Sequence, residues 1–261
     1  MAYVKCLRGI NGSEIPEGST ATPTDVVETL LNCAGIFDKE YTTIAQLLAD
    51  TTSLNTVITS NNAIDYLVRS TTFATAVTAD QTAMSYIGLN NYASNTLLGD
   101  ATWCSAICNS TYFESVLNVK VPTMTGYTTP SGQVYYTSFA GGNYTWRAFD
   151  GNLTTEGLYV YGQGDGAVTY EFPTAQRIIL ATVYIASGTV NYHRNQTIKS
   201  SDDNITFNAE SDTKTAIIGG TNKFIFNNGN VKKYWQMYGD TLQGGGSAYV
   251  NEIQFYGRAD V

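Results

Sequence analysis

The chain has 261 residues, enough for one large domain or two of ordinary size. Its net charge is −8 and its Lys and Arg residues form no cluster, which excludes a protein that holds nucleic acid or an anionic membrane through a basic surface. Charged residues make up only 14% of the chain while Tyr occurs 19 times, a composition typical of a β-rich or extracellular protein.

The first 40 residues predict an extended segment followed by one helix. Glycine and proline recur between residues 9 and 23 and prevent a continuous helix there. Thr24 and Asp25 then supply an N-cap for the apolar run that begins at Val26, and Gly35 ends it. We expect residues 1–40 to anchor the protein on a partner.

Residues 41–120 consist of four 20-residue repeats that align without a gap, which predicts stacked structural units. Positions four, seven and seventeen of each repeat are apolar, a spacing that places them on one face of two short helices. Polar residues at positions ten and eleven predict a cap between the two helices. The recurring apolar residues are Ile44, Leu47 and Val57; Ile64, Leu67 and Val77; Met84, Ile87 and Leu97; and Cys104, Ile107 and Leu117.

Each repeat is therefore expected to form a helical hairpin that buries its apolar face against the next hairpin. No charged position recurs across the four repeats, which favours a stacked spacer over a binding groove. Cys104 and Cys108 have the spacing of a metal-binding pair on a helix. The chain has one His and no second pair, however, so two buried apolar side chains are favoured.

Residues 121–126 combine Pro, Gly and Thr and predict a linker, after which the pattern becomes that of strands. Strands are predicted at residues 167–172, 178–186, 223–226 and 234–238. The fold class predicted for the chain is multidomain α + β: an N-terminal stack of short helical repeats (41–120) followed by an antiparallel β-sandwich (121–261).

Three segments in this half carry a family resemblance. They are YTWRAFDGN at residues 144–152, SSDDNITF at residues 200–207 and AYVNEIQFYG at residues 248–257. In this order they resemble the opening turn, middle hairpin and closing strand of the discoidin or coagulation-factor C-domain family. The resemblance extends from Pro122 to Gly257 and implies a galactose-binding-like jelly roll.

The resemblance also implies a structural cation, usually Ca²⁺, between the acidic turn and the last strand. The matching positions are Asp150, Asn152, Thr154 or Thr155, and Glu252, whose oxygens suit calcium. The family commonly has Thr-x-Trp after the turn, whereas this chain continues with Glu156, which leaves the ligand set open. The alternative is an ordinary Asp-Gly turn with a solvated Glu252.

In this family the ligand site lies on variable loops at one end of the sandwich. A sugar needs an aromatic ring for its apolar face and polar groups for its hydroxyls. The candidates that meet this need are Tyr159, Tyr161, Tyr192, His193 and Arg194. The alternative for residues 192–194 is a polar hairpin tip, and Trp235 is interpreted as a core residue.

Catalysis has little support in the sequence. His193 is the one His, and no nucleophile-elbow, H-E-x-x-H or phosphate-loop motif occurs. Asp202 and Asp203 are adjacent, so their side chains point in different directions and form a poor acid–base pair. The sequence predicts a protein that is not an enzyme.

Short repeats with capped helices and an Asn/Thr-rich surface look like those of bacteriophage virion proteins. We therefore expect a phage fibre or capsid decoration protein, a homo-oligomer located in the virion. Residues 1–40 would bind other virion proteins, and the sandwich would bind a host cell-surface glycan. No signal peptide or membrane-spanning run is visible, and host lysis would release such a protein without one. The alternatives are a carbohydrate-binding module of a bacterial surface protein and a purely structural capsid decoration protein.

Overall fold

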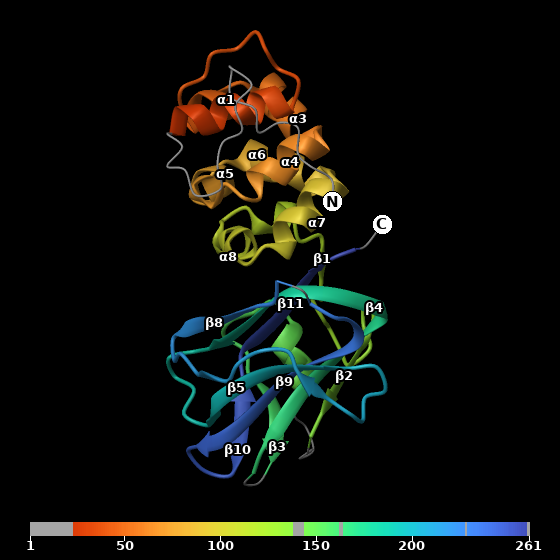
Figure 1. The fold of residues 1–261 in the computed structure, drawn as a ribbon. Helices are drawn as coiled ribbons and strands as arrows, with labels where there is room; N and C mark the ends of the chain where they lie inside the picture. Colours follow the sequence, from red (N-terminus) through yellow and green to blue (C-terminus); the bar gives the residue numbers. More distant parts are fainter. Residues whose placement is uncertain (1–22, 138–143, 162–163, 228, 260–261) are drawn as a thin grey trace. The chain divides into compact units, whose positions relative to one another are not determined.

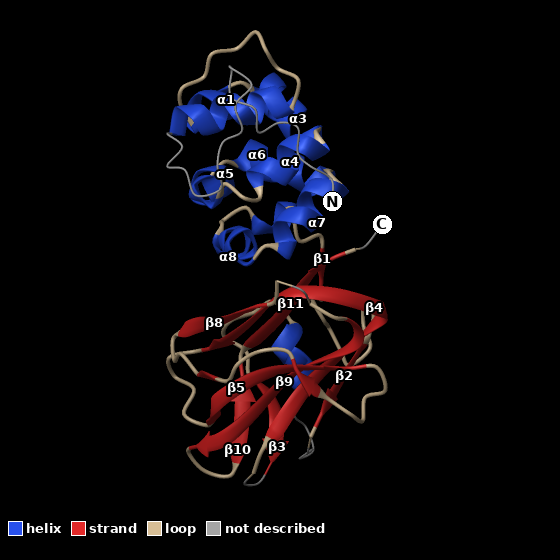
Figure 2. Cartoon of the chain, viewed as in Figure 1, coloured by secondary structure: helices blue, strands red, loops and turns tan. Residues whose placement is uncertain are grey.

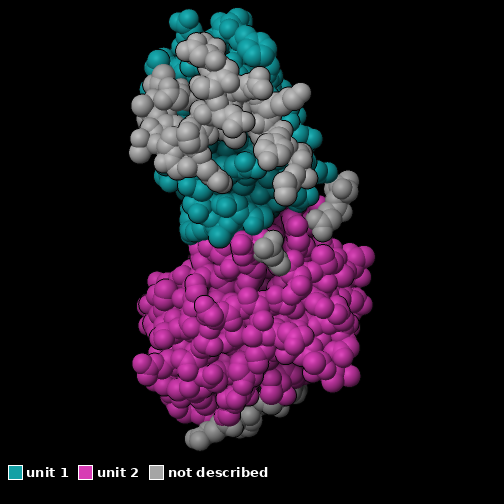
Figure 3. Space-filling model, viewed as in Figure 1, with its two compact units in different colours: residues 1–116, 261 teal, residues 117–260 magenta. Residues whose placement is uncertain are grey.

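The computed structural model describes residues 23–137, 144–161, 164–227 and 229–259. The predicted extended anchor lies almost entirely outside these residues. The chain divides into two compact units, residues 1–116 with residue 261 and residues 117–260 (Figure 3). The first unit is helical and the second is an antiparallel β-sandwich, which confirms the predicted fold class (Figure 2).

The helical unit consists of short helices that follow one another almost without loops. Among its described residues they are α1 (Pro23–Cys33), α2 (Ile44–Ala49), α3 (Thr51–Thr59), α4 (Asn61–Leu67), η1 (Thr71–Phe73), α5 (Ala74–Thr78), α6 (Gln81–Leu89), α7 (Asn91–Gly99), α8 (Ala101–Asn109) and η2 (Phe113–Ser115). In the part of the chain that the structure describes, no helix has the length and apolar content needed to cross a membrane.

Burial in this unit repeats every ten residues. From residue 51 to residue 110, the third, fourth and seventh positions of each ten-residue block are buried. The tenth position is polar and stands before the next helix. Its side chain caps α3, α4, α6, α7 and α8, as in Asp80, whose Oδ1 accepts the backbone N–H of Ala83 at 2.8 Å. Cys104 and Cys108 occupy buried positions, as predicted.

The helices stack with three ten-residue blocks per turn. α3 packs against α6, α4 against α7, and α5 against α8, and the first two pairs start 30 residues apart (Figure 1). The prediction that 20-residue hairpins stack on one another is therefore wrong. Alternate ten-residue blocks are most alike in sequence. The helices that pack against each other from one turn to the next, however, come from every third block.

Polar caps also connect one turn of the stack to the next. Asn90 accepts the N–H of Ala93 at 2.9 Å and donates through Nδ2 to the carbonyl of Ile58 at 3.1 Å. Ser60 Oγ likewise donates to the carbonyl of Cys33 at 3.1 Å. A capping side chain can therefore satisfy the start of its own helix and the end of a helix in the preceding turn.

The sandwich contains eleven described strands. They are β1 (Val119–Lys120), β2 (Gln133–Tyr136), β3 (Gly157–Tyr161), β4 (Gly166–Ile185), β5 (Tyr192–Ser201), β6 (Asn208–Ala209), β7 (Lys214–Thr215), β8 (Gly220–Ile225), β9 (Val231–Gln243), β10 (Ser247–Val250) and β11 (Glu252–Arg258). The predicted strands 167–172 and 178–186 are two parts of β4, while 223–226 lies largely in β8 and 234–238 lies in β9.

The long strand β4 belongs to both layers of the sandwich. Its first part pairs with β2 and β9, and its second part, from Ile178 onward, pairs with β8 and β11. The register shifts between Glu171 and Gln176, where the strand passes from one layer to the other. β5 extends the first layer beside β9, and β3 pairs with β10 in a separate ribbon.

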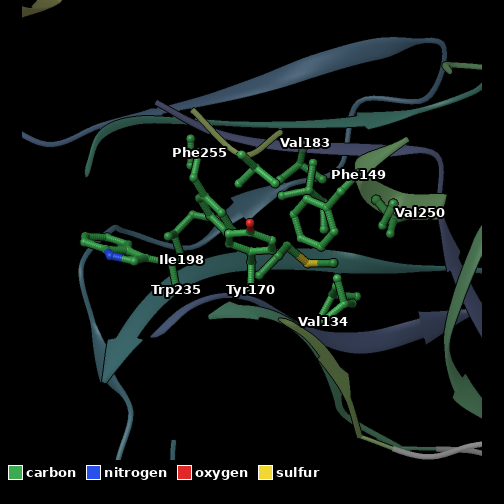
Figure 4. Packing of buried hydrophobic residues seen from close by; sticks show 14 of the residues in the cluster. Val134, Phe149, Tyr170, Val183, Ile198, Trp235, Val250 and Phe255 are labelled. Atoms are coloured by element: carbon green, nitrogen blue, oxygen red, sulfur yellow. The ribbon is translucent and has the colours of Figure 1, made fainter. Parts of the chain in front are cut away.

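The core fills the space between these layers with large side chains (Figure 4). Trp235, which is fully buried, comes from β9 as predicted, and Tyr170 comes from β4. Phe149 of η3 (Thr145–Phe149) lies 5.5 Å from Tyr170 and 6.2 Å from Phe255, measured between ring centroids. The short helix that precedes the acidic turn is thus fixed to the core by an aromatic side chain.

Candidate functional site

The acidic turn follows η3 directly and is closed by its own side chains. Asp150 Oδ1 accepts the N–H of Asn152 at 2.8 Å, and Thr155 Oγ1 donates to both carboxylate oxygens of Asp150 at 2.9 and 2.7 Å. Gly151 has φ +71°, a backbone conformation that L side chains rarely adopt. The sequence D-G-N-x-T-T therefore folds as one hydrogen-bonded loop.

The last strand closes this loop from the other side. Glu252 Oε2, at the start of β11, accepts the N–H of Gly151 at 3.1 Å. Asn251 Nδ2 donates to the carbonyl of Thr155 at 3.0 Å. The structure thus brings together all four positions of the predicted cation site, Asp150, Asn152, Thr155 and Glu252, although they are about a hundred residues apart in the chain.

Glu252 is 6% exposed, so the alternative of a solvated side chain is wrong. Burial, together with the negative charge of Asp150, raises the pKa of Glu252 to about 8. Hydrogen bonds from Gln254 Nε2, at 3.0 Å, and from Gly151 lower the pKa of Glu252 in part. A desolvated carboxylate beside a second carboxylate is an arrangement that a bound cation stabilises.

The donor set fits a hard cation. Asp150 and Glu252 supply carboxylates, and Gln254 Oε1 is a buried oxygen with no hydrogen-bond partner among the described residues. Calcium accepts carboxylate, amide, carbonyl and water oxygens together. Within the described ranges no group of three or more His, Cys, Asp or Glu residues is placed to hold a metal, so such an ion would depend on neutral oxygens for most of its ligands.

Two of the predicted ligand-binding residues are buried and lie in the interior. Tyr159 is 1% exposed and His193 is 0% exposed. The hydroxyl of Tyr159 lies 2.7 Å from His193 Nδ1, and His193 Nε2 lies 2.8 Å from the carbonyl of Gly164. Burial lowers the pKa of His193 and raises the pKa of Tyr159. The pair joins β3, β5 and the β3–β4 loop, and it cannot contact a ligand at the surface.

Glycine makes this interior position possible. Gly166 and Gly239 are register partners on β4 and β9. A Cβ atom on Gly239 would lie 2.5 Å from Cβ of His193, whereas one on Gly166 would lie 1.7 Å from Cγ2 of Val160. The imidazole therefore occupies space that a side chain at position 239 would otherwise fill.

The other predicted ligand residues do not converge. Residues 192–194 begin β5 and pair with β9, so they form no hairpin tip. Tyr192 is half-buried against the core, and Arg194 is exposed. The side chain of Tyr161 lies outside the described part of the structure. Because side chains alternate along a strand, His193 and Arg194 point to opposite faces.

A second aromatic group lies on η3 and just before it. The rings of Tyr144 and Trp146 are 6.1 Å apart at 77°, and the guanidinium of Arg147 lies 4.1 Å from the Tyr144 ring centroid and 5.9 Å from that of Trp146. Tyr144 is 47% exposed. We call Tyr144, Trp146 and Arg147 the aromatic–arginine cluster. These three residues belong to the 144–152 segment that carries the family resemblance, but no ligand role was predicted for them.

Comparison with known proteins finds structural similarity only. No family model and no curated protein sequence matches the chain. Chitosan-binding module 1 of a chitosanase/glucanase from Paenibacillus sp. IK-5 has 21% identity and a TM-score of 0.41, over 50% of this chain and 96% of that module. The family 32 carbohydrate-binding module of Clostridium perfringens NanJ, in complex with galactose, has 14% identity and a TM-score of 0.42, over 53% and 99%. The CBM32-3 module of a family 31 glycoside hydrolase from the same organism has 22% identity and a TM-score of 0.40, over 48% and 88%.

Proposed function

We propose that this chain is a non-enzymatic glycan-binding protein and that the sandwich binds sugar at the aromatic–arginine cluster. The observation that carries the proposal is the exposed Tyr144 ring, set edge-on to Trp146 with a guanidinium against it. Sugars bind to proteins through this combination, because a ring covers the C–H face of the sugar and N–H donors reach its hydroxyls.

The cluster is held in place by the core. Thr145, Ala148 and Phe149 of η3 are buried, and the N–H of Thr145 donates to the hydroxyl of Tyr127 at 3.3 Å. Such a rigid site loses little conformational entropy when it binds a ligand. It is nevertheless shallow, since few groups converge on it and water competes for each hydroxyl. We expect an affinity per site on the order of micromolar to millimolar.

The cation has a structural part in this proposal. Asp150, Asn152, Thr155 and Glu252 would hold Ca²⁺ immediately after η3. The ion would neutralise two adjacent carboxylates and fix the loop against β11. Asp150 is also the C-cap residue of η3, so the geometry of this loop determines the position of the cluster.

The proposal extends to the biological setting of the protein. We propose a phage virion accessory protein in which residues 1–40 bind other virion proteins and several copies present their sandwiches to the host cell surface. The capped, stacked helices of the first unit support a spacer role. Multiple copies would raise the effective affinity roughly a hundredfold or more. A reading frame that also encodes a glycoside hydrolase would instead favour a carbohydrate-binding module of a bacterial surface protein.

The test uses the full chain, biotinylated and presented both as single copies and as streptavidin tetramers, on glycan arrays and host cells. Tyr144→Ala should weaken binding by about tenfold, equivalent to about 1.4 kcal/mol. Arg194→Ala, at an exposed site on β5, is the matched control and should bind as the parent does. If the tetramer binds neither glycans nor cells, the glycan-binding proposal fails and the structural decoration role takes its place.

A further inference from the structure

We propose that Arg147 makes the cluster selective for acidic glycans, in which a sugar carboxylate pairs with its guanidinium. This inference rests on the proposed function and adds the class of ligand.

Arg147 is held in a fixed orientation. Its guanidinium lies against the Tyr144 ring and near the Trp146 ring, at the 4.1 and 5.9 Å given above. Its backbone N–H donates to the carbonyl of Tyr144 at 2.8 Å, which keeps the arginine and its ring partner in one short turn. Stacking uses the face of the guanidinium and leaves its five N–H donors at the edge.

Among the described residues, Arg147 forms no ion pair. The carboxylate nearest in sequence is that of Asp150, and its oxygens accept from Asn152 and Thr155. The preceding segment, residues 138–143, has the sequence SFAGGN and contains no acidic residue. Two lysines of the same unit differ in this respect, since Lys232 pairs with Asp202 at 2.5 Å and Lys233 pairs with Glu171 at 2.7 Å.

The donors that remain fit a carboxylate. The planar guanidinium forms two parallel N–H···O bonds with a carboxylate, and charge-assisted bonds of this kind are roughly twice as strong as those to a neutral hydroxyl. An exposed aromatic ring beside the guanidinium can cover the face of the same sugar. A uronic or sialic acid unit combines both features, because its carboxylate is attached directly to the ring.

The net negative charge of the protein opposes this ligand only weakly. Residues 121–261 carry 9 Lys and Arg against 11 Asp and Glu, whereas residues 1–120 carry 5 against 11. Most of the net negative charge therefore belongs to the first unit. At physiological ionic strength, charges more than about 8 Å apart are largely screened, so the local pairing decides binding.

The experiment measures binding of the full-length tetramer to immobilised oligosaccharides of uronic and sialic acids. Methyl esters of the same compounds keep the sugar and remove the charge, and neutral and sulfated oligosaccharides complete the array. The parent should bind the acids about tenfold or more tightly than the esters, and added salt should reduce the difference. Arg147→Gln should remove the preference and retain binding to neutral sugars. Arg194→Gln, at the exposed arginine of β5, should leave the preference unchanged.

The outcomes separate the two proposals. Equal binding of acids and esters by the parent would overturn the selectivity and leave glycan binding intact. The same conclusion would follow if Arg194→Gln lost the preference for acids and Arg147→Gln kept it. A preference for sulfated over carboxylated compounds would replace the carboxylate with a sulfate as the recognised group. Failure to bind any compound would overturn both proposals. Thermal melting of each variant confirms that it is folded.

Discussion

Asn90 offers a direct test of the three-block turn, because its two amide atoms have different tasks. Oδ1 caps its own helix, α7, and Nδ2 reaches the carbonyl of Ile58 in the preceding turn. Substitution by aspartate keeps the capping oxygen, since Asp and Asn are equally good N-caps. It replaces the donor with a negatively charged oxygen that faces the Ile58 carbonyl. Only the bond between turns is lost.

The size of the effect follows from that geometry. A lost hydrogen bond reduces stability by about 1 kcal/mol, and an unsatisfied or repelled partner adds about 1–2 kcal/mol. We therefore expect Asn90→Asp to lower the free energy of unfolding of the helical unit by about 2 kcal/mol. Asn90→Ala also loses the cap, which adds about 1 kcal/mol. Asp80→Asn is the matched control, because Asp80 caps α6 in the same way and the change should stay within about 0.5 to 1 kcal/mol.

The assay is urea unfolding of the full chain followed by circular dichroism at 222 nm, where the helical unit dominates the signal. The transition midpoints of the three variants and the parent are compared, provided that the slope m of the transition is the same for all four proteins. If Asn90→Asp is no more destabilising than Asp80→Asn, the turn-to-turn hydrogen bond contributes nothing to stability and the reasoning is refuted.

Three further predictions concern close packing and the cation site. Gly88→Ala should destabilise the stack by about 1–3 kcal/mol, because the new Cβ would lie 1.8 Å from the Ser115 carbonyl oxygen. Gly99→Ala is the control and should be neutral or stabilising, because a Cβ at Gly99 would have nothing within 4 Å. Equal effects of the two substitutions in urea unfolding would contradict this packing. Without added cation, the contribution of Glu252 to stability should be fully present below about pH 4.5 and be lost as pH rises toward 8, by as much as roughly 4 kcal/mol, because the raised pKa of Glu252 means that the folded state keeps a proton that the unfolded state loses. Glu252→Gln should flatten that profile, and an unchanged profile would show that the carboxyl is not desolvated. Calcium should raise the melting temperature of the parent and not that of Asp150→Ala, and a chelator without effect on the parent would rule out the cation.

The sequence predicts the local features of the first unit well. The polar residues at position ten of the repeat identify the caps Asp50 and Asn90, and the apolar positions identify the buried face. Ser70 makes no capping bond with its side chain, and the caps at the end of each repeat, Ser60, Asp80 and Asp100, were not predicted. The number of blocks per turn depends on contacts that form only after folding, such as the close approach of Gly88 to the backbone carbonyl of Ser115. A 20-residue similarity between blocks does not contain that information, which explains the incorrect hairpin model.

The candidate site, too, was only partly predictable from the sequence. The acidic turn and Glu252 could be matched to a motif, and they meet in the structure. The burial of Tyr159 and His193 could not be foreseen. It depends on a contact between β3 and β5 and on the glycine at position 239 of β9. No sequence signal separates Tyr144, which is exposed, from Phe149 close to it in the chain, which belongs to the core.

The shared strand β4 also bears on how the protein folds during its synthesis. Contacts in the helical unit join consecutive helices and helices about 30 residues apart, so this unit can form soon after its own residues leave the ribosome. The second layer of the sandwich requires β11, whose Ile253 pairs with Val183 of β4. Until β11 has emerged, one edge of β4 remains an unpaired apolar template for other chains. We expect aggregation of nascent or truncated chains to begin at that edge, and removal of β11 to affect solubility far more than removal of a helical block.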